Sequence, residues 1–349
     1  MSKGIGISKE QLSEDGEPCI LYGELYTKYK SEIIKQVESK TDINGSKLKR
    51  SKANDVIIPC SGETAVDIAT ARCVPFDNIL FGGDLNVISL HQYDGAFMSY
   101  QLNGKRKYDI ARVAQGVSIV HLYGEHLKAI KTYNPTLPEQ QKIAKLLSLL
   151  DDRIDTQNKI IEKLQSLIKG IAQHCIKEST SGNTYVKLGD ICQITTGKLD
   201  ANAQVDNGIY PFFTCAEQPF KIDSFAFDTE ALLISGNGAN LGYINYYKGK
   251  FNAYQRTYVL DLFSENIQYI KWALKVLLPK RIAIEKSSSN TPYIVLSTLT
   301  DLRLPIPCKS KQSFIANLMQ SLERKLSNQI AQYDSYNYLK QYLLRQMFI

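Results

Sequence analysis

The segment that most constrains the fold is Leu137 to Ile171, LPEQQKIAKLLSLLDDRIDTQNKIIEKLQSLIKGI, near the middle of the chain. Its apolar residues recur from Ile143 to Ile171 at alternating steps of four and three, and Gln157 is the one polar residue in the series. This spacing predicts a long helix whose apolar side pairs with another helix in a coiled coil. The chain must therefore supply or bind a partner helix.

The C-terminal segment repeats the same pattern. Aligning Ile143 with Ile315 sets an offset of 172 residues between positions 143 and 315, and Gln157 then falls on Gln329. The same offset aligns DLNVISL with RTYVLDL and FMSYQL with YIKWAL. Two copies of this length fill nearly the whole chain. The sequence therefore predicts a tandem duplication of a globular domain followed by a long helix.

The two long helices are expected to pair with each other in antiparallel directions, with Ile143 near the C-terminal end of the second helix. In that arrangement central residues meet their own counterparts, so Gln157 and Gln329 are expected within about one turn of each other. A buried amide must find a hydrogen-bond partner, which would disfavour shifted registers. Alternatively, both glutamines point to solvent where the helices bow apart. The expected pairing residues are Ile143, Leu147, Leu150, Ile154, Gln157, Ile161, Leu164, Met319, Leu322, Leu326, Gln329, Tyr333 and Tyr336.

The predicted fold class is α+β, with two tandem mixed α/β domains, each followed by one helix of an antiparallel coiled coil. The expected boundaries are 1–134, 135–178, 179–306 and 307–349. In the second copy, TYVKLGDICQI predicts a half-buried strand, YINYYKGKFNAYQRTYVLDL a hairpin turning at Lys248 to Lys250, and ENIQYIKWALKVLL a helix stopped by Pro279. Because GEPCILY aligns with GIYPFFT, the counterpart of the strand Tyr185 to Ile194 is expected before Met1.

Composition excludes several classes of protein. The 349 residues are 44% hydrophobic, but no apolar run approaches the roughly 18 residues that a membrane span needs. The start, MSKGIGISKE, lacks the apolar segment of a signal peptide. Seven scattered cysteines show no C-x-x-C spacing, so neither a zinc site nor a disulfide framework is indicated. These features predict a cytoplasmic protein with reduced thiols and no membrane partner.

Catalytic motifs are missing from the sequence. SGNGANLG does not open a helix as G-x-G-x-x-G, so it is interpreted as a turn at a strand end, and no adomet-binding glycine motif is visible. Four scattered histidines form no evident triad or metal cluster. Asp151 and Asp152 are interpreted as solvated charges on a helix face rather than an acid–base pair. We therefore expect this chain to be non-catalytic and to bind no metal or cofactor.

Nucleic-acid binding fits the composition better, because the chain has 42 Lys and Arg against 35 Asp and Glu, a net charge of +7. Basic loops occur in both copies, and the loops diverge between copies while the helices agree. Lysine and arginine can hold phosphates, and Asn, Gln and Arg can read base edges. The candidate DNA-binding residues are Lys47, Lys49, Arg50, Lys52, Ser61, Glu63, Thr64, Lys105 and Arg106 in the first copy, and Asn237, Asn240, Lys250, Gln255, Arg256, Arg281, Lys286, Ser288 and Asn290 in the second.

The chain resembles the specificity (S) subunits of type I restriction–modification systems over essentially its whole length. NPTLPEQQKIAKLLSLLDDRIDTQNKIIEKLQ is similar to that family's helical region. YPFFTCAEQPFKIDSFAFDTEALLISGNGANLGYINYYKGKFNAYQRTYVL is similar to a target-recognition domain. GEPCILYGELYTKY and FGGDLNVISL resemble the first recognition domain. Two departures are the missing first strand and CKSKQ in place of LPEQ before the second helix.

This resemblance implies a non-catalytic reader of double-stranded DNA with a bipartite, asymmetric target. It further implies docking of two methyltransferase (modification) subunits, which carry adomet, and binding of restriction motor subunits. Two alternatives stay open. The chain could be a DNA-binding or anti-restriction variant that recruits no enzyme, or a tandem protein-binding scaffold with incidental basic loops.

Overall fold

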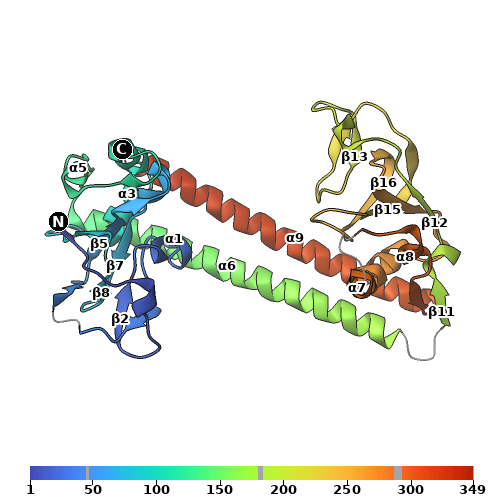
Figure 1. Cartoon of the computed structure of the whole chain (residues 1–349), viewed down its shortest axis with the longest axis horizontal. Helices are drawn as coiled ribbons and strands as arrows, with labels where there is room; N and C mark the ends of the chain where they lie inside the picture. The colour runs from blue at the N-terminus through green and yellow to red at the C-terminus, as the bar shows by residue number, and fades with distance from the viewer. Residues whose placement is uncertain (45–46, 180–183, 287–292, 349) are drawn as a thin grey trace. The chain divides into compact units, whose positions relative to one another are not determined.

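The computed structural model describes residues 1–44, 47–179, 184–286 and 293–348 (Figure 1). The chain divides into two compact units: unit 1 contains Met1–Lys159 and Ile330–Ile349, and unit 2 contains Ile160–Gln329. Two long helices, α6 (Leu137–Glu178) and α9 (Lys309–Gln346), contribute to both units. Each unit therefore combines one globular domain with part of each long helix. None of the described helices has an apolar stretch long enough to cross a membrane.

Unit 1 contains two four-stranded sheets. The first has the order β1 (Ser2–Lys3), β9 (Leu85–Ile88), β5 (Asp55–Pro59), β7 (Arg72–Val74), and all its strand pairs are antiparallel. The second has the order β3 (Ser39–Thr41), β2 (Glu17–Ile20), β8 (Leu80–Phe81), β4 (Lys49–Arg50), with β2 parallel to β8. The short strands β6 (Ser61–Gly62) and β10 (Val120–His121) form a further pair. The short helices are α1 (Glu24–Thr27), α2 (Ala65–Ile68), α3 (Gly95–Asn103), α4 (Lys107–Val113) and α5 (Gly124–Lys128).

Unit 2 is built on a six-stranded sheet. Its order is β12 (Gln193–Thr196), β17 (Thr257–Asp261), β15 (Phe227–Ser235), β16 (Ile244–Ala253), β13 (Tyr210–Phe213), β14 (Phe220–Ile222). β13 runs parallel to β16, whereas the other neighbours are antiparallel. A separate pair joins β11 (Thr184–Lys187) to β18 (Arg303–Ile306), and the remaining helices are α7 (Ile267–Lys286) and α8 (Leu296–Thr300).

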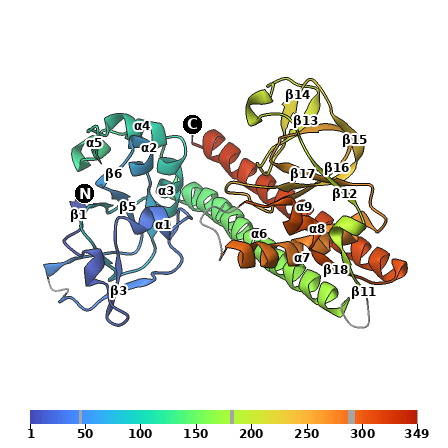
Figure 2. The same cartoon turned by 45° about the vertical axis from the view of Figure 1, so that its right-hand side comes forward.

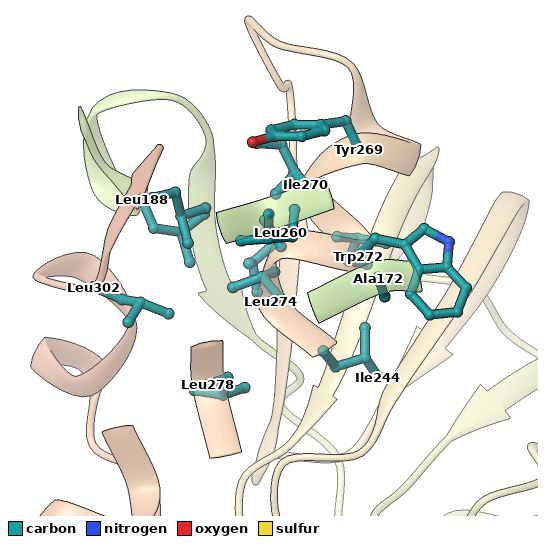
Figure 3. Packing of buried hydrophobic residues seen from close by; sticks show 14 of the residues in the cluster. Ala172, Leu188, Ile244, Leu260, Tyr269, Ile270, Trp272, Leu274, Leu278 and Leu302 are labelled. Carbon is teal, nitrogen blue, oxygen red and sulfur yellow. The ribbon is translucent and has the colours of Figure 1, made fainter. Parts of the chain in front are cut away.

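The core of unit 2 joins the sheet to the long helices through α7 (Figure 2). Leu232 and Leu260 from the sheet, Leu274 from α7, Ile168 from α6 and Met319 from α9 belong to one buried cluster. Figure 3 shows Leu260 beside Leu274 in this cluster. Burying these apolar side chains is the main favourable contribution to folding of the unit.

The predicted duplication is present in the strand pairing. Ile57 of β5 pairs with Val87 of β9, and Leu233 of β15 pairs with Val259 of β17. The strand β1 also pairs with β9 as β12 pairs with β17, with Ser2 opposite Val87. The two units therefore share one sheet plan in which equivalent residues of β9 and β17 are 172 positions apart.

The long helices run antiparallel within each unit, which confirms the predicted coiled-coil direction. In unit 1, Ile143 near the start of α6 packs in one cluster with Leu343 and Met347 at the end of α9. In unit 2, the Lys311 ammonium near the start of α9 donates to the carbonyl of Glu178 at the end of α6, over 3.1 Å.

All thirteen predicted pairing residues are buried or half-buried. Gln157 is 2% exposed and Gln329 is half-buried. Because Gln157 lies in unit 1 and Gln329 in unit 2, their mutual placement stays a prediction.

Three predictions about the second copy were wrong. Lys248 to Lys250 form no turn, because β16 continues through them and Gly249 pairs with Thr229 of β15. The hairpin turns instead at Gly236 to Gly242, where Gly238 and Gly242 adopt positive φ angles that favour glycine. The strand predicted for TYVKLGDICQI is split into β11 and β12 by the 3-10 turn Leu188–Asp190.

Pro279 also does not stop its helix, since α7 continues to Lys286. Proline removes one backbone donor and disfavours the helical interior. Leu278 is fully buried, however, and Ile282 packs against the same cluster. Tertiary packing on both sides of Pro279 therefore keeps the chain helical.

The interpretation of Asp151 as a solvated charge was also wrong. Its side chain is 4% exposed. The Asp151 carboxylate accepts hydrogen bonds from Tyr100 Oη at 2.7 Å and Ser31 Oγ at 3.0 Å, and lies 2.7 Å from Lys340 Nζ. All three partners are distant in sequence, so local pattern could not identify them. Asp152 remains exposed and pairs with Lys35 at 2.7 Å.

Candidate nucleic-acid interface

In unit 2, the loops that follow β12, β13 and β15 converge on the turn Tyr254 to Arg256. The Gly236 amide donates to the Arg256 carbonyl at 2.9 Å, and the Gln255 amide donates to the Leu199 carbonyl at 2.9 Å. The Asn240 side-chain amide donates to the Cys215 carbonyl at 3.1 Å. We call these four segments, 197–199, 214–215, 236–240 and 254–256, the unit 2 loop cluster.

A glycine allows these loops to approach one another closely. A Cβ atom on Gly197 would overlap the Ala253 carbonyl oxygen and lie 2.6 Å from that of Tyr254. Any other residue would push loop 197–199 away from the turn. The unit 2 loop cluster is therefore held by backbone contacts and by the Asn240 side chain, which leaves the side chains of Gln255 and Arg256 available for recognition.

Two of the predicted DNA-binding side chains project from this cluster. Gln255 and Arg256 are both exposed, whereas their backbones are held by neighbouring loops. Arginine presents a planar set of donors that matches phosphate or guanine, and glutamine can pair with adenine. Asn237 and Asn240 lie in the adjoining hairpin and are half-buried. The structure thus brings together four of the nine residues predicted in the second copy.

Unit 1 contains an equivalent cluster. The Cys60 amide donates to the Asp84 carbonyl at 2.7 Å, as the Gly236 amide does to that of Arg256. A Cβ atom on Gly4 would overlap the Gly82 carbonyl oxygen, as one on Gly197 would overlap that of Ala253. We call segments 4–5, 60–64 and 82–84 the unit 1 loop cluster, which includes the predicted residues Ser61, Glu63 and Thr64.

The equivalent turns have opposite charge. Asp84 is exposed and has a φ of 58°, and it takes the place that Arg256 takes in unit 2. A carboxylate can accept from the amino group of cytosine, whereas an arginine donates to guanine or phosphate. The two clusters therefore share a backbone arrangement but present side chains of opposite charge. Asp84 and Gly4 were missed as site residues by sequence reasoning, although the alignment of DLNVISL with RTYVLDL already placed Asp84 opposite Arg256.

The other predicted residues of unit 2 lie apart from the turn. Lys250 is on β16, with its ammonium 4.6 Å from the centre of the Phe225 ring. Arg281 on α7 forms an ion pair with Glu285 at 2.7 Å. Its neighbour Ile282 reaches Gly242, so this part of α7 borders the hairpin. Ser288 and Asn290, and the side chain of Lys286, lie outside the described residues.

The other predicted residues of unit 1 fall in two further places. The first is the edge strand β4 and its flanks, which contain Lys47, Lys49, Arg50 and Lys52. Arg50 is bound there by both carboxylate oxygens of Glu17, and this guanidinium holds the pKa of Glu17 below its usual value. The second is the turn between α3 and α4, which contains Lys105 and Arg106. The sequence prediction therefore combined residues from three separate surfaces of unit 1.

Across residues 1–44, 47–179, 184–286 and 293–348, no group of three or more His, Cys, Asp or Glu side chains could hold a metal ion. Burial raises the pKa of several cysteines, including that of Cys60 to about 11, aided by Asp84 and opposed by Lys3. A thiol with a raised pKa is a poor nucleophile. Exposed side chains of the two clusters, among them Asp84, Gln255 and Arg256, offer hydrogen bonding and charge.

Comparison with known proteins matches this architecture to one family. A family model described as the type I restriction modification DNA specificity domain matches residues 8–166 and 180–333. The chain is 44% identical over 137 residues to the type I restriction enzyme EcoDI specificity subunit of Escherichia coli, covering 39% of this chain and 30% of that protein. It spans about 30 to 64% of the length of three curated relatives, all specificity subunits.

Solved structures show the same fold. The S subunit of the type I restriction–modification system from M. genitalium aligns with a TM-score of 0.68 at 20% identity, covering 100% of this chain and 93% of that one. A chain from a structure on complex assembly and conformational transition of the type I R-M system aligns with a TM-score of 0.57 at 16% identity, covering 99% and 93%.

Proposed function

Because the chain belongs to the type I restriction modification DNA specificity domain family, we propose that it reads a bipartite, asymmetric target in double-stranded DNA. The observation that carries this proposal is the pair of loop clusters. They share backbone contacts and differ in the exposed side chain at the central turn, Arg256 against Asp84. Two DNA-binding clusters with the same backbone arrangement but different exposed side chains would recognise two different half-sites.

The same proposal assigns catalysis to other proteins. Two methyltransferase subunits carrying adomet would dock on the duplicated scaffold, and restriction motor subunits would bind that assembly. A tandem repeat supplies two related surfaces, which suits two copies of one partner. This chain would supply DNA specificity without transferring methyl groups or cleaving DNA. Its proposed location is the cytoplasm, where the host DNA and these partners would be present.

Methylation mapping tests the proposal directly. Host DNA is sequenced for modified adenines in cells with and without this chain, in the presence of its methyltransferase partner. We expect one bipartite, asymmetric motif to be methylated only when the chain is present. Methylation by the purified chain alone would contradict the assignment of chemistry to the partners. Absence of any chain-dependent motif would favour the non-recruiting alternative.

A salt titration separates DNA binding from a purely protein-binding scaffold. If phosphate contacts are made, the logarithm of the DNA association constant should fall linearly with the logarithm of salt concentration, with a slope of about −0.9 for each phosphate contacted. A flat dependence, or no binding at low salt, would favour the scaffold alternative.

Replacing Arg256 with alanine should weaken binding of the mapped target by about 1 to 3 kcal/mol, if the guanidinium reads a base. The expected loss follows from the exposed side chain on a turn that is fixed by neighbouring loops. The matched control is Arg324→Ala, which removes an exposed arginine on α9 of the same unit. Equal losses for both variants, measured by anisotropy of a labelled duplex, would contradict a specific role for Arg256.

A further inference from the structure

A groove in unit 2 lies between α6, α7 and one residue of α9. Its volume is about 540 Å³, within the range of roughly 300 to 1,000 Å³ that binding pockets occupy. The apolar lining includes Ile168 and Ala172 of α6, Trp272 and Val276 of α7, and Leu326 of α9. Figure 3 shows Ala172 close to the indole of Trp272. The groove is therefore large enough to receive one or two apolar side chains.

The repeat shows why this groove exists in unit 2. At the offset of 172 residues, Ala172 corresponds to Leu344 and Val276 corresponds to Gly104. In unit 1 a Cβ atom on Gly104 would lie 2.9 Å from the Leu344 carbonyl oxygen, so α9 directly contacts the end of α3. Leu344 is 3% exposed and packs with Phe348. In unit 1 the larger Leu344 takes the place of Ala172, and Gly104 allows α9 to lie directly against the end of α3. Together these two residues close the site in unit 1.

The aromatic residue that lines the groove also differs between the copies in its hydrogen bonding. Tyr100 in unit 1 corresponds to Trp272 in unit 2, and Tyr100 donates to the Asp151 carboxylate at 2.7 Å. Glu323, the counterpart of Asp151, instead binds Lys271 at 2.8 Å and Lys275 at 3.1 Å.

Trp272 is left with an unsatisfied donor. Its side chain is 6% exposed, and its Nε1–H has no acceptor among the residues that the structure describes. Figure 3 shows this nitrogen on the side of the ring away from Leu260 and Leu274. A buried donor without an acceptor is destabilising, and an incoming acceptor that reached this nitrogen would remove that penalty.

The charges around the groove select the kind of acceptor. Its lining includes three lysines, Lys169, Lys275 and Lys280, and no carboxylate. Lys169 and Lys280 are exposed. Lys275 shares Glu323 with Lys271 and also lies 4.4 Å from the centre of the Trp272 ring. An occupant with carboxylates beside its apolar side chains would therefore be attracted to the rim and could accept from the indole.

We propose that this groove of unit 2 binds an acidic amphipathic helix of a partner protein, and that its counterpart in unit 1 does not. Apolar side chains of the helix enter between α6 and α7, while its carboxylates meet Lys169, Lys280 and the Trp272 Nε1–H. The duplicated scaffold would then carry one such site rather than two. This inference concerns only unit 2 and does not depend on DNA reading.

The test uses the full chain and a synthetic amphipathic peptide with leucines on one face, glutamates beside them and no tryptophan. Trp272 is the one tryptophan of the sequence, so its fluorescence reports occupancy of the groove. We expect a saturable change in emission. Ala172→Leu introduces the residue of the closed unit 1 site and should weaken binding about tenfold or more, as loss of a central interface contact does. Thermal unfolding shows whether this variant remains folded.

A second pair of variants tests the charges without touching the core. Reversing both exposed lysines, with Lys169→Glu and Lys280→Glu, should weaken the acidic peptide about fivefold or more and strengthen a peptide with lysines in place of glutamates. Lys142→Glu with Lys145→Glu makes the same change at exposed positions of α6 in unit 1 and should have no effect. No emission change with the acidic peptide, equal binding of the lysine peptide, or unaltered binding to both groove variants would overturn the proposal.

Discussion

Replacing Lys340 with methionine is expected to lower the free energy of unfolding of unit 1 by about 3 to 5 kcal/mol. The Lys340 ammonium lies 2.6 Å from the Glu32 carboxylate and 2.7 Å from that of Asp151. The three side chains are 12%, 9% and 4% exposed. Removing the cation leaves two buried carboxylates without their shared partner, and an uncompensated buried charge is among the most destabilising changes known.

The measurement is hydrogen exchange of the α3 peptides, since Trp272 lies in unit 2 and would not report on unit 1. Arg345→Met is the matched control, because it removes an exposed cation from the same helix and unit. Adding Glu32→Gln and Asp151→Asn to Lys340→Met should recover part of the loss by removing the stranded charges. Equal exchange in Lys340→Met and Arg345→Met would show that the cluster contributes little.

The effect has a defined pH dependence. Burial alone would lower the pKa of Lys340, but Glu32 and Asp151 outweigh it and raise the pKa above its usual value. A raised lysine pKa means that the stabilising charge is fully present below the unfolded value and is lost as the pH rises through the folded value. The difference between wild type and Lys340→Met should therefore be constant near neutral pH and shrink only above about pH 10.4.

Exchanging the unit 2 loop cluster with that of a related subunit of known target should change one half of the methylated motif. Segments 236–240 and 254–256 would be replaced together, because the Gly236 amide holds the Arg256 carbonyl. The original half-site should then lose about 1 to 3 kcal/mol of binding for each altered base pair, roughly additively. A target differing at several base pairs would no longer be methylated, which makes this the largest expected change in specificity.

The reciprocal exchange is the control. Replacing segments 60–64 and 82–84 of the unit 1 loop cluster should change the other half of the motif and leave the first half intact. Both halves changing together in either exchange would contradict two independent readers. An unchanged motif would place base reading on other elements, such as β4 or the end of α7.

The sequence predicted the long helices, their pairing direction and the duplication, because each rests on a repeated pattern. Ile143 and its equivalents recur at heptad spacing, and the offset of 172 residues connects segments whose strand pairs are equivalent in the structure. The predicted hairpin at Lys248 to Lys250 was wrong because a glycine between lysines has the same local signature as a turn. Gly249 instead lies within β16, where only the partner strand β15 determines its conformation.

The candidate sites were less predictable, because they depend on contacts between distant segments. Arg50 is basic and occurs in a basic run, yet Glu17 already occupies its guanidinium. Arg256 is exposed, and no carboxylate among the residues that the structure describes forms an ion pair with it. Asp151 resembled a surface charge in sequence and became buried through Tyr100 and Lys340, which are 51 residues before it and nearly 190 after it. The residue types predicted the chemistry of the candidate sites. Contacts between distant segments determine which of these side chains remain available to bind DNA.

The contribution of α9 to unit 1 has a consequence for how the protein is made. Phe97 and Tyr100 are buried against Leu344 and Phe348, which leave the ribosome more than 240 residues later. Unit 2 is continuous from Ile160 to Gln329, so all of its segments leave the ribosome before Leu344 and Phe348 do. Domains usually fold in the order of their synthesis. Here the first domain to be translated is the last to complete its core, and until then it exposes an apolar surface that a chaperone would recognise.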